Sequence, residues 1–195
     1  INNLLFINTM SILQNLFHNL ILKFSRIKTR FVKNLFINLF KNHYKISLEE
    51  FARKNVDVYS SFNDFFTREF DEGVRPIDQT ENTIVSPVDG KVMEFGRVSD
   101  GKLFQLKNME YNLSHLLNKN PKLIKGFKNA FYVTIYLAPY NYHRVHLPYQ
   151  GKLLHNQLIG GKTYKVNEQA LKKINALYTK NTRQISRFEG SKVNF

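Results

Sequence analysis

Residues 84–95, IVSPVDGKVMEF, mark the point at which the character of the chain changes. Two β-prone runs, Ile84-Val85 and Lys91–Phe95, flank the stretch Ser86-Pro87-Val88-Asp89-Gly90. Proline fixes φ, aspartate bonds back to the backbone and glycine accepts a positive φ, so this composition is typical of a tight turn. Such a turn also presents a carboxylate at the edge of a sheet, where Asp89 can orient a histidine.

Further β-prone runs follow, separated by Gly, Pro, Asn and Asp, which is the pattern of an antiparallel or mixed sheet. They are Leu103–Leu106, Phe131–Leu137, Tyr142–His146 and Lys152–Ile159. Helical interruptions are expected near Asn112–Leu117 and over Asn167–Leu177.

Helices are expected before the turn. Ser47-Leu48-Glu49-Glu50 is a capping box and predicts a helix start, and Ser61 with Asp64 predicts a second helix over Phe62–Glu69. The fold class is therefore α+β, with N-terminal amphipathic helices followed by a β-rich core that carries short helical insertions.

The first 45 residues differ in charge from the rest. The net charge of the chain is +14, and the first acidic residue is Glu49. Apolar residues recur at helical spacing from Phe6 to Phe24, which favours an amphipathic helix in a membrane interface, beside anionic lipid. A targeting segment and a helix packed on its own domain remain alternatives. We divide the chain into a basic, membrane-associating or targeting segment (1–45) and a core (46–195).

Composition limits the chemistry. There is no cysteine, which excludes disulfides, thiolate metal sites and cysteine nucleophiles. The seventeen Phe and many Asn and Lys indicate AT-rich coding, so single aromatic or asparagine residues carry little signal.

Two histidines lie close together in Tyr142-His143-Arg144-Val145-His146-Leu147-Pro148. If the segment is a strand, His143 and His146 point to opposite faces, which disfavours a shared metal and suits two separate roles. No acidic residue occurs between Tyr111 and Asn167, where lysines and Arg144 form a solvated basic face or a site for an anionic head group.

Taken together, the motifs resemble those of the phosphatidylserine decarboxylase family. Any one is weak, but their order and spacing over roughly residue 25 to the end are similar to that family. They are Ser61-Phe62-Asn63-Asp64-Phe65-Phe66-Thr67-Arg68-Glu69, Arg75-Pro76-Ile77-Asp78, Ser86-Pro87-Val88-Asp89-Gly90 and Tyr142-His143-Arg144-Val145-His146-Leu147-Pro148.

The resemblance implies a proenzyme that cuts itself before a serine of a Gly-Ser pair and turns that serine into a covalent pyruvoyl group. Its ketone condenses with the amine of phosphatidylserine and withdraws electrons while CO₂ leaves, giving phosphatidylethanolamine. By the same resemblance, Asp89 holds and polarises His146, and His146 is the base in self-cleavage. His143 serves proton transfer in decarboxylation. No metal is implied.

The serine is expected beyond Phe195, because Gly190-Ser191 lies too close behind the histidines and reads as a turn. This chain alone is expected to be inactive. The partners implied are an anionic phospholipid membrane, phosphatidylserine, the C-terminal α-subunit of the same proenzyme and a second copy in a homodimer, with no nucleic acid. The location implied is peripheral, on a bacterial or mitochondrial inner membrane. The alternative function is a non-catalytic basic protein that binds lipid or nucleic acid.

Overall fold

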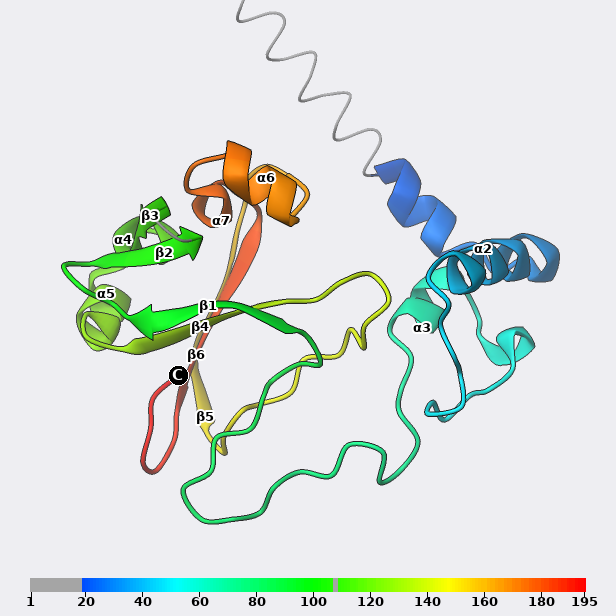
Figure 1. Ribbon diagram of the computed structural model, residues 1–195, viewed down its shortest axis with the longest axis horizontal. Coiled ribbons are helices and arrows are strands. Elements are labelled where there is room, and N and C mark those ends of the chain that lie inside the picture. Colours follow the sequence, from blue (N-terminus) through cyan, green and yellow to red (C-terminus); the bar gives the residue numbers. More distant parts are fainter. Residues whose placement is uncertain (1–18, 107–108) are drawn as a thin grey trace, which may run out of the picture. The chain divides into compact units, whose positions relative to one another are not determined.

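The computed structural model describes residues 19–106 and 109–195 (Figure 1). The chain divides into two compact units. The first comprises the residues up to Asp78 together with Pro139–Val145, and the second comprises Gln79–Ala138 and His146–Phe195. The chain therefore passes between the units three times.

The first unit is helical. Residues 19–25 form a helix, and α2 (Arg30–His43) follows after a short break. The amphipathic helix expected from Phe6 to Phe24 lies largely outside the described residues. On α2, Ile37 is fully buried, and the Lys33 ammonium is buried where it donates to Asn34 and the carbonyls of Val56 and Asp57. A buried lysine is tolerated because its three donors find acceptors.

Two short elements complete this unit, namely η1 (Val56–Val58) and α3 (Phe62–Phe66). Ser61 caps α3 as predicted, since its side chain accepts from the Asp64 N–H at 3.2 Å. The helix ends earlier than the expected Glu69. The core of the first unit is formed by buried aromatic and aliphatic side chains, namely Ile37, Ile46, Leu48, Phe51, Tyr59, Phe65 and Tyr142.

The helix predicted to start at Ser47 is wrong. The Ser47 hydroxyl accepts from the Glu49 N–H, but the chain then turns and extends. Phe51 pairs with Phe70 in an antiparallel bridge, and their rings stack at 4.8 Å. Backbone pairing with a segment distant in sequence, together with this ring contact, outweighs the local capping signal.

In its described residues, the second unit contains three two-stranded antiparallel sheets (Figure 1). Strand β1 (Lys91–Arg97) pairs with β4 (Phe131–Tyr136), and β2 (Lys102–Leu106) pairs with β3 (Met109–Asn112). The third pair joins β5 (Lys152–Ile159) to β6 (Arg183–Glu189). The predicted runs at β1, β2, β4 and β5 are confirmed, and the α+β class is confirmed with them.

Short helices accompany the sheets. They are α4 (Leu113–Leu116), α5 (Pro121–Phe127), α6 (Glu168–Lys173) and α7 (Leu177–Lys180). Asparagine caps three of them: Asn112 on α4, Asn120 on α5 and Asn167 on α6. The expectation that single asparagine residues carry little signal is wrong at these positions. A side-chain amide oxygen satisfies helix N–H groups that otherwise lack partners.

Two polar side chains tie the helices to the strands. Gln105 on β2 is fully buried, donates to the carbonyls of Leu171 and Ile174 at 2.8 Å and accepts from the Leu177 N–H at 2.6 Å. Arg183 donates to Leu116 and Thr179, at the ends of α4 and α7. The apolar core beside them contains Val98, Leu103, Tyr111 and Leu113.

Two predicted strands are not strands. Ile84-Val85 and Tyr142–His146 lie outside any helix or strand, although each takes part in single backbone hydrogen bonds. The sequence reading did not foresee β3, β6 or α5. The predicted boundary after residue 45 falls inside the first unit, where α2 packs on η1 and α3.

Candidate functional site

The turn that carries Asp89 is fixed against β4. The Ser86 hydroxyl donates to the Val88 carbonyl at 2.7 Å within the turn. Gly90 lies so close to β4 that an added Cβ would meet Ile135 Cγ2 and the Tyr136 carbonyl oxygen at 2.7 Å. The positive φ expected at Gly90 is not found. Among the described glycines, Gly73 and Gly101 are the ones with a positive φ. This position requires glycine for close approach to β4, and the half-buried Asp89 is held beside β1.

The segment of the second histidine pairs with this turn. The Val85 N–H donates to the Pro148 carbonyl at 2.9 Å, and the His146 N–H donates to the Pro87 carbonyl at 2.8 Å. The pairing is antiparallel, because the earlier residue of one segment faces the later residue of the other. It brings the Asp89 turn and His146 into one region of the second unit, with His146 exposed.

The first histidine belongs to the other unit. The His143 ring stacks on Phe66 at the end of α3, with centroids 4.0 Å apart and an interplanar angle of 25°. Tyr142 is buried with its ring 4.3 Å from that of Phe70. The two imidazoles therefore have separate surroundings. The cause is the passage of the chain from one unit to the next, and not alternation along a strand.

The motif that starts at Ser61 holds this loop through its last residues. Arg68 donates to the Tyr140 carbonyl at 3.0 Å. Arg144 donates to the Thr67 carbonyl at 2.8 Å and pairs with the Glu69 carboxylate. Two motifs that lie far apart in the sequence thus form one structural element of the first unit.

Arg68 is a buried cation with aromatic neighbours. Its guanidinium lies 4.3 Å from the Phe51 ring centroid and 5.0 Å from that of Phe65, and burial lowers its pKa. Its Nε has no hydrogen-bond partner. The ring faces offset part of the cost of removing the guanidinium from water. The buried Arg68 then holds the start of the loop through its hydrogen bond to the Tyr140 carbonyl.

A carboxylate near the same helix is strongly perturbed. Arg53 donates to both oxygens of Asp64 at 2.7 and 2.8 Å, and the Ser60 N–H donates to it at 2.8 Å. Hydrogen bonds from Arg53, followed by those from Ser60, lower the pKa of Asp64 to about 2 against the opposing effect of burial. The ion pair fixes α3, from which Phe66 reaches His143.

Two further features concern a possible metal site and the Gly190-Ser191 pair. In the described part of the chain, no group of three or more His, Asp or Glu is arranged to hold a metal ion. Gly190 and Ser191 lie in a hairpin turn in which the Gly190 N–H donates to the Val193 carbonyl at 2.9 Å. A Cβ at Gly190 would meet that carbonyl oxygen at 2.7 Å, so the turn requires glycine there.

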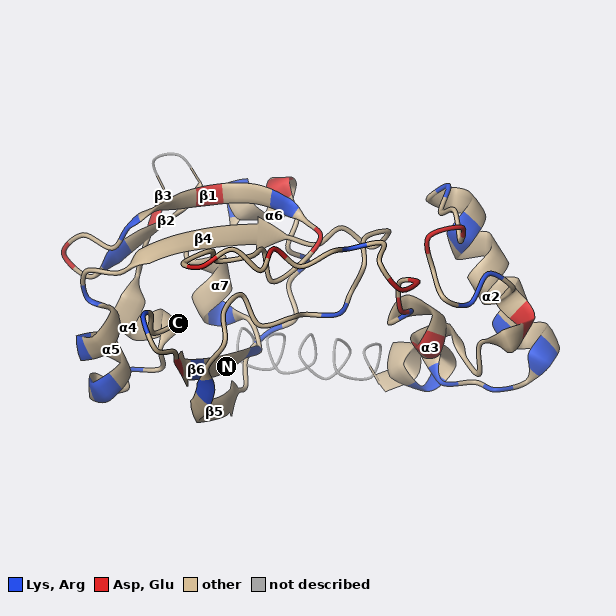
Figure 2. Cartoon of the chain, turned by 90° about the horizontal axis from the view of Figure 1, so that it is seen from below, with Lys and Arg blue, Asp and Glu red and all other residues tan. Residues whose placement is uncertain are grey.

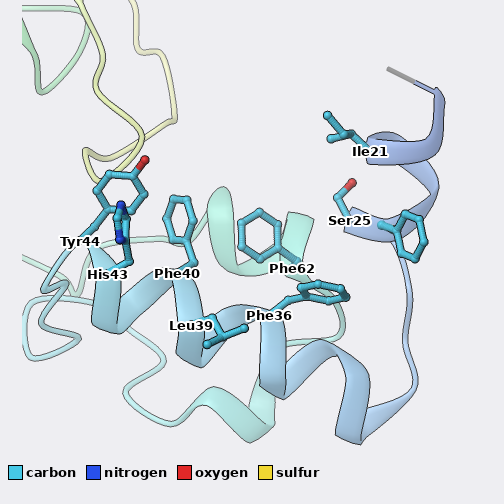
Figure 3. A pocket seen from close by; sticks show the side chains of 9 residues that line it. Ile21, Ser25, Phe36, Leu39, Phe40, His43, Tyr44 and Phe62 are labelled. Carbon is cyan, nitrogen blue, oxygen red and sulfur yellow. The ribbon is translucent and has the colours of Figure 1, made fainter. Parts of the chain in front are cut away.

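The first unit also contains an apolar pocket of about 830 Å³ (Figure 3). Rings from α2 and α3 form its floor, and residues of the 19–25 helix form one side. Its lining includes Ile21, Phe24, Phe36, Leu39, Phe40 and Phe62. Sequence reasoning missed this pocket, although the recurrence of apolar residues in α2 was a usable signal. Phe66 was also missed as the support of His143, since no local pattern shows which ring a histidine will meet.

Comparison with known proteins now defines the class. A family model described as phosphatidylserine decarboxylase matches residues 62–195, so the chain belongs to the phosphatidylserine decarboxylase family. It is similar to proteins named phosphatidylserine decarboxylase proenzyme. It is 38% identical to that of Shewanella amazonensis over 170 residues, which cover 87% of this chain and 59% of the relative.

Other relatives give the same result. Identity to the Psychrobacter arcticus proenzyme is 39%, over 81% of this chain and 57% of the relative. Identity to the Saccharophagus degradans proenzyme is 37%, over 89% of this chain and 60% of the relative. The chain therefore spans about three fifths of the length of the curated relatives it matches. The alternative of a non-catalytic lipid- or nucleic-acid-binding protein receives no support from these matches.

Proposed function

We propose that this chain is the part of a phosphatidylserine decarboxylase proenzyme that carries the carboxylate and imidazole groups for self-cleavage and turnover. The observation that carries the proposal is the pairing of Val85 and Pro87 with Pro148 and His146, which joins the Asp89 turn to the second histidine. In the complete protein the product is phosphatidylethanolamine.

The roles proposed for the three side chains are those that the family resemblance implies, and their surroundings are compatible with them. Asp89 orients the His146 imidazole and stabilises its protonated form, and the exposed His146 takes the proton of the serine hydroxyl during self-cleavage. His143, with one ring face against Phe66, has its orientation set by stacking and exchanges a proton with the substrate carbon. Phosphatidylserine is the substrate.

A pyruvoyl group, once formed, supplies a carbonyl that condenses with the substrate amine and draws electrons from the bond to CO₂. The residues present fit its formation, because a carboxylate and an imidazole on two paired segments are the groups that serine activation needs. The serine is assigned to a Gly-Ser pair other than Gly190-Ser191, whose tight turn is fully explained by the hairpin.

The test uses the complete proenzyme with single substitutions. Asp89→Asn and His146→Ala should each lower the rate of self-cleavage by at least about a hundredfold, so that the proenzyme stays uncleaved on a denaturing gel. His143→Ala should be cleaved at the normal rate but lose phosphatidylethanolamine formation by a similar factor. Equal behaviour of all three variants contradicts the division of roles. Absence of both cleavage and product in the unmodified protein contradicts the function itself.

We also propose that the first unit binds the surface of an anionic membrane. In the described part of the chain, no helix is long and apolar enough to span a bilayer. Exposed apolar side chains do follow one face of α2 at a spacing of four, and Phe31 is 79% and Leu39 59% exposed. Leu20, Ile21 and Phe24 of the neighbouring helix are also exposed.

Charge selects the type of membrane. Lys23, Arg26 and Lys28 are exposed beside these apolar side chains, and no acidic residue precedes Glu49. Figure 2 shows Lys and Arg along α2 and near α5. Basic residues near an anionic bilayer contribute about 1 kcal/mol each, and the apolar pocket can receive part of a lipid chain. This supports a peripheral position on a bacterial or mitochondrial inner membrane.

Vesicle sedimentation tests this surface with two substitutions that add the same charge. Leu39→Glu, on the apolar face, should weaken binding to vesicles that contain phosphatidylglycerol by about tenfold or more. Val58→Glu changes a side chain that is 55% exposed on η1 and should leave binding within about twofold. Equal loss in both variants contradicts the surface. Tight binding to oligonucleotides with none to vesicles contradicts the membrane partner.

A further inference from the structure

One edge of β6 is only partly covered. At one end the Thr182 N–H donates to the Lys162 carbonyl at 2.9 Å, and at the other Phe188 exchanges hydrogen bonds of 2.6 and 3.1 Å with Phe195. Backbone N–H groups alternate between the two edges of a strand, so those of Gln184 and Ser186 point to the same edge as that of Phe188. Among the described residues, no backbone group pairs with this edge at those two positions.

A strand already begins on this edge. After the turn at Gly190-Ser191-Lys192 the chain runs back beside β6, and Glu189 and Asn194 form an antiparallel bridge. Phe195 faces Phe188, with their rings stacked at 5.2 Å. In this register the second residue after Phe195 lies opposite Ser186, and the fourth lies opposite Gln184. The open edge therefore has room for one short run of strand.

The inner face of the same ribbon contains two unpartnered polar atoms. His155 on β5 and Arg187 on β6 are cross-strand partners. His155 Nε2 and Arg187 Nε are both buried without a hydrogen-bond partner. Buried polar groups without a partner are destabilising and are rare in complete folds. Two such atoms on one face indicate that a further segment packs on this ribbon.

We propose that the segment following Phe195 in the longer proenzyme continues as a strand along β6 and fills the edge at Gln184 and Ser186. It would become the third strand of the β5–β6 sheet. The chain covers 57–60% of the relatives described above, so those proteins are longer than the part that it matches. The inference rests on the proposed function only in that a longer proenzyme exists.

Residue-resolved hydrogen exchange on the longer protein and on the 195-residue chain tests this strand. The amides of Gln184 and Ser186 should exchange at least about a hundredfold more slowly in the longer protein. Those of Ile185 and Arg187, which face β5, should be protected in both. Equal rates at Gln184 and Ser186 in the two proteins overturn the proposal. Protection in the short chain that rises with its concentration also overturns it, in favour of pairing between two copies.

A matched pair of variants separates the edge from the rest of the strand. Ser186→Pro removes an N–H that faces the open edge, whereas Ser186→Ala retains it. In the longer protein, only Ser186→Pro should abolish the slow exchange at Gln184. Should Ser186→Pro fail to fold, the exchange rates of the unmodified proteins still decide. Loss of decarboxylation with normal protection rejects the proposed function but not the strand, and activity without protection does the reverse.

Discussion

Asp64 illustrates how much one side chain contributes at the start of α3. It accepts two hydrogen bonds from Arg53 and one from the Ser60 N–H, and its side chain is 27% exposed. These interactions exist only with the ionised carboxyl group in the folded state, so folding and ionisation are coupled. A pKa lowered from 3.8 to about 2 means that the carboxylate stabilises the fold.

Asp64→Asn should therefore lower the free energy of unfolding by about 2 kcal/mol at pH 7. Because the folded-state pKa is depressed, the contribution is complete above the unfolded-state pKa and is lost as the pH falls through about 2. Urea unfolding at pH 7 and near pH 2 measures the difference, which should shrink at the lower pH. Asp71→Asn, which removes an exposed pair with Lys54, is the control and should change little. Equal losses for the two variants at pH 7 contradict the assignment.

The turn before β1 depends on a glycine for its distance from β4. Gly90→Ala places a methyl group against Ile135 and the Tyr136 carbonyl, and should destabilise the chain by about 1–3 kcal/mol. It should also slow self-cleavage of the proenzyme, because Asp89 shifts with the turn. The melting temperature and the cleavage rate measure the two effects.

Gly126 provides the matched control for this element. It lies in α5, where an added Cβ meets nothing within 4 Å. Gly126→Ala should be neutral or stabilise by up to about 1 kcal/mol, since alanine has the higher helix propensity. A melting temperature for Gly90→Ala equal to that of Gly126→Ala would show that the close approach is unimportant.

On the scale of the whole molecule, the two units are not each formed by one continuous stretch of the chain. Residues 71–83 form no helix or strand and contain only turns, bends and irregular backbone. Pro139–Val145, from the second half of the sequence, belongs to the first unit. Because Pro139–Val145 belongs to the first unit, a cut within residues 71–78 should leave the two pieces attached to each other through that unit.

A protease specific for glutamate should cut first after Glu72, which is exposed in this segment. The two pieces should nevertheless elute together in gel filtration, because Tyr142 packs on Phe70 and Arg68 holds the Tyr140 carbonyl. Tyr142→Ala should promote their separation after the cut. Separation of the unmodified pieces under native conditions contradicts the shared first unit.

Local patterns in the sequence determined the elements whose partners are close by. The run Lys152–Ile159 is the observed β5, Ser61 begins α3, and the helices predicted near Asn112 and Asn167 are present. Alternation, capping and turn chemistry act over a few residues, so they can be read without knowledge of the fold. The order of the motifs also led to the family.

Only the tertiary structure decided where the site residues lie. Ser47 has a helix-start pattern but begins no helix, because Phe51 pairs with Phe70. His143 and His146 are three residues apart, yet one stacks on Phe66 and the other pairs with Pro87, in different units. The two histidine contacts join positions more than fifty residues apart, and backbone pairing and ring packing at that separation depend on how the whole chain is folded.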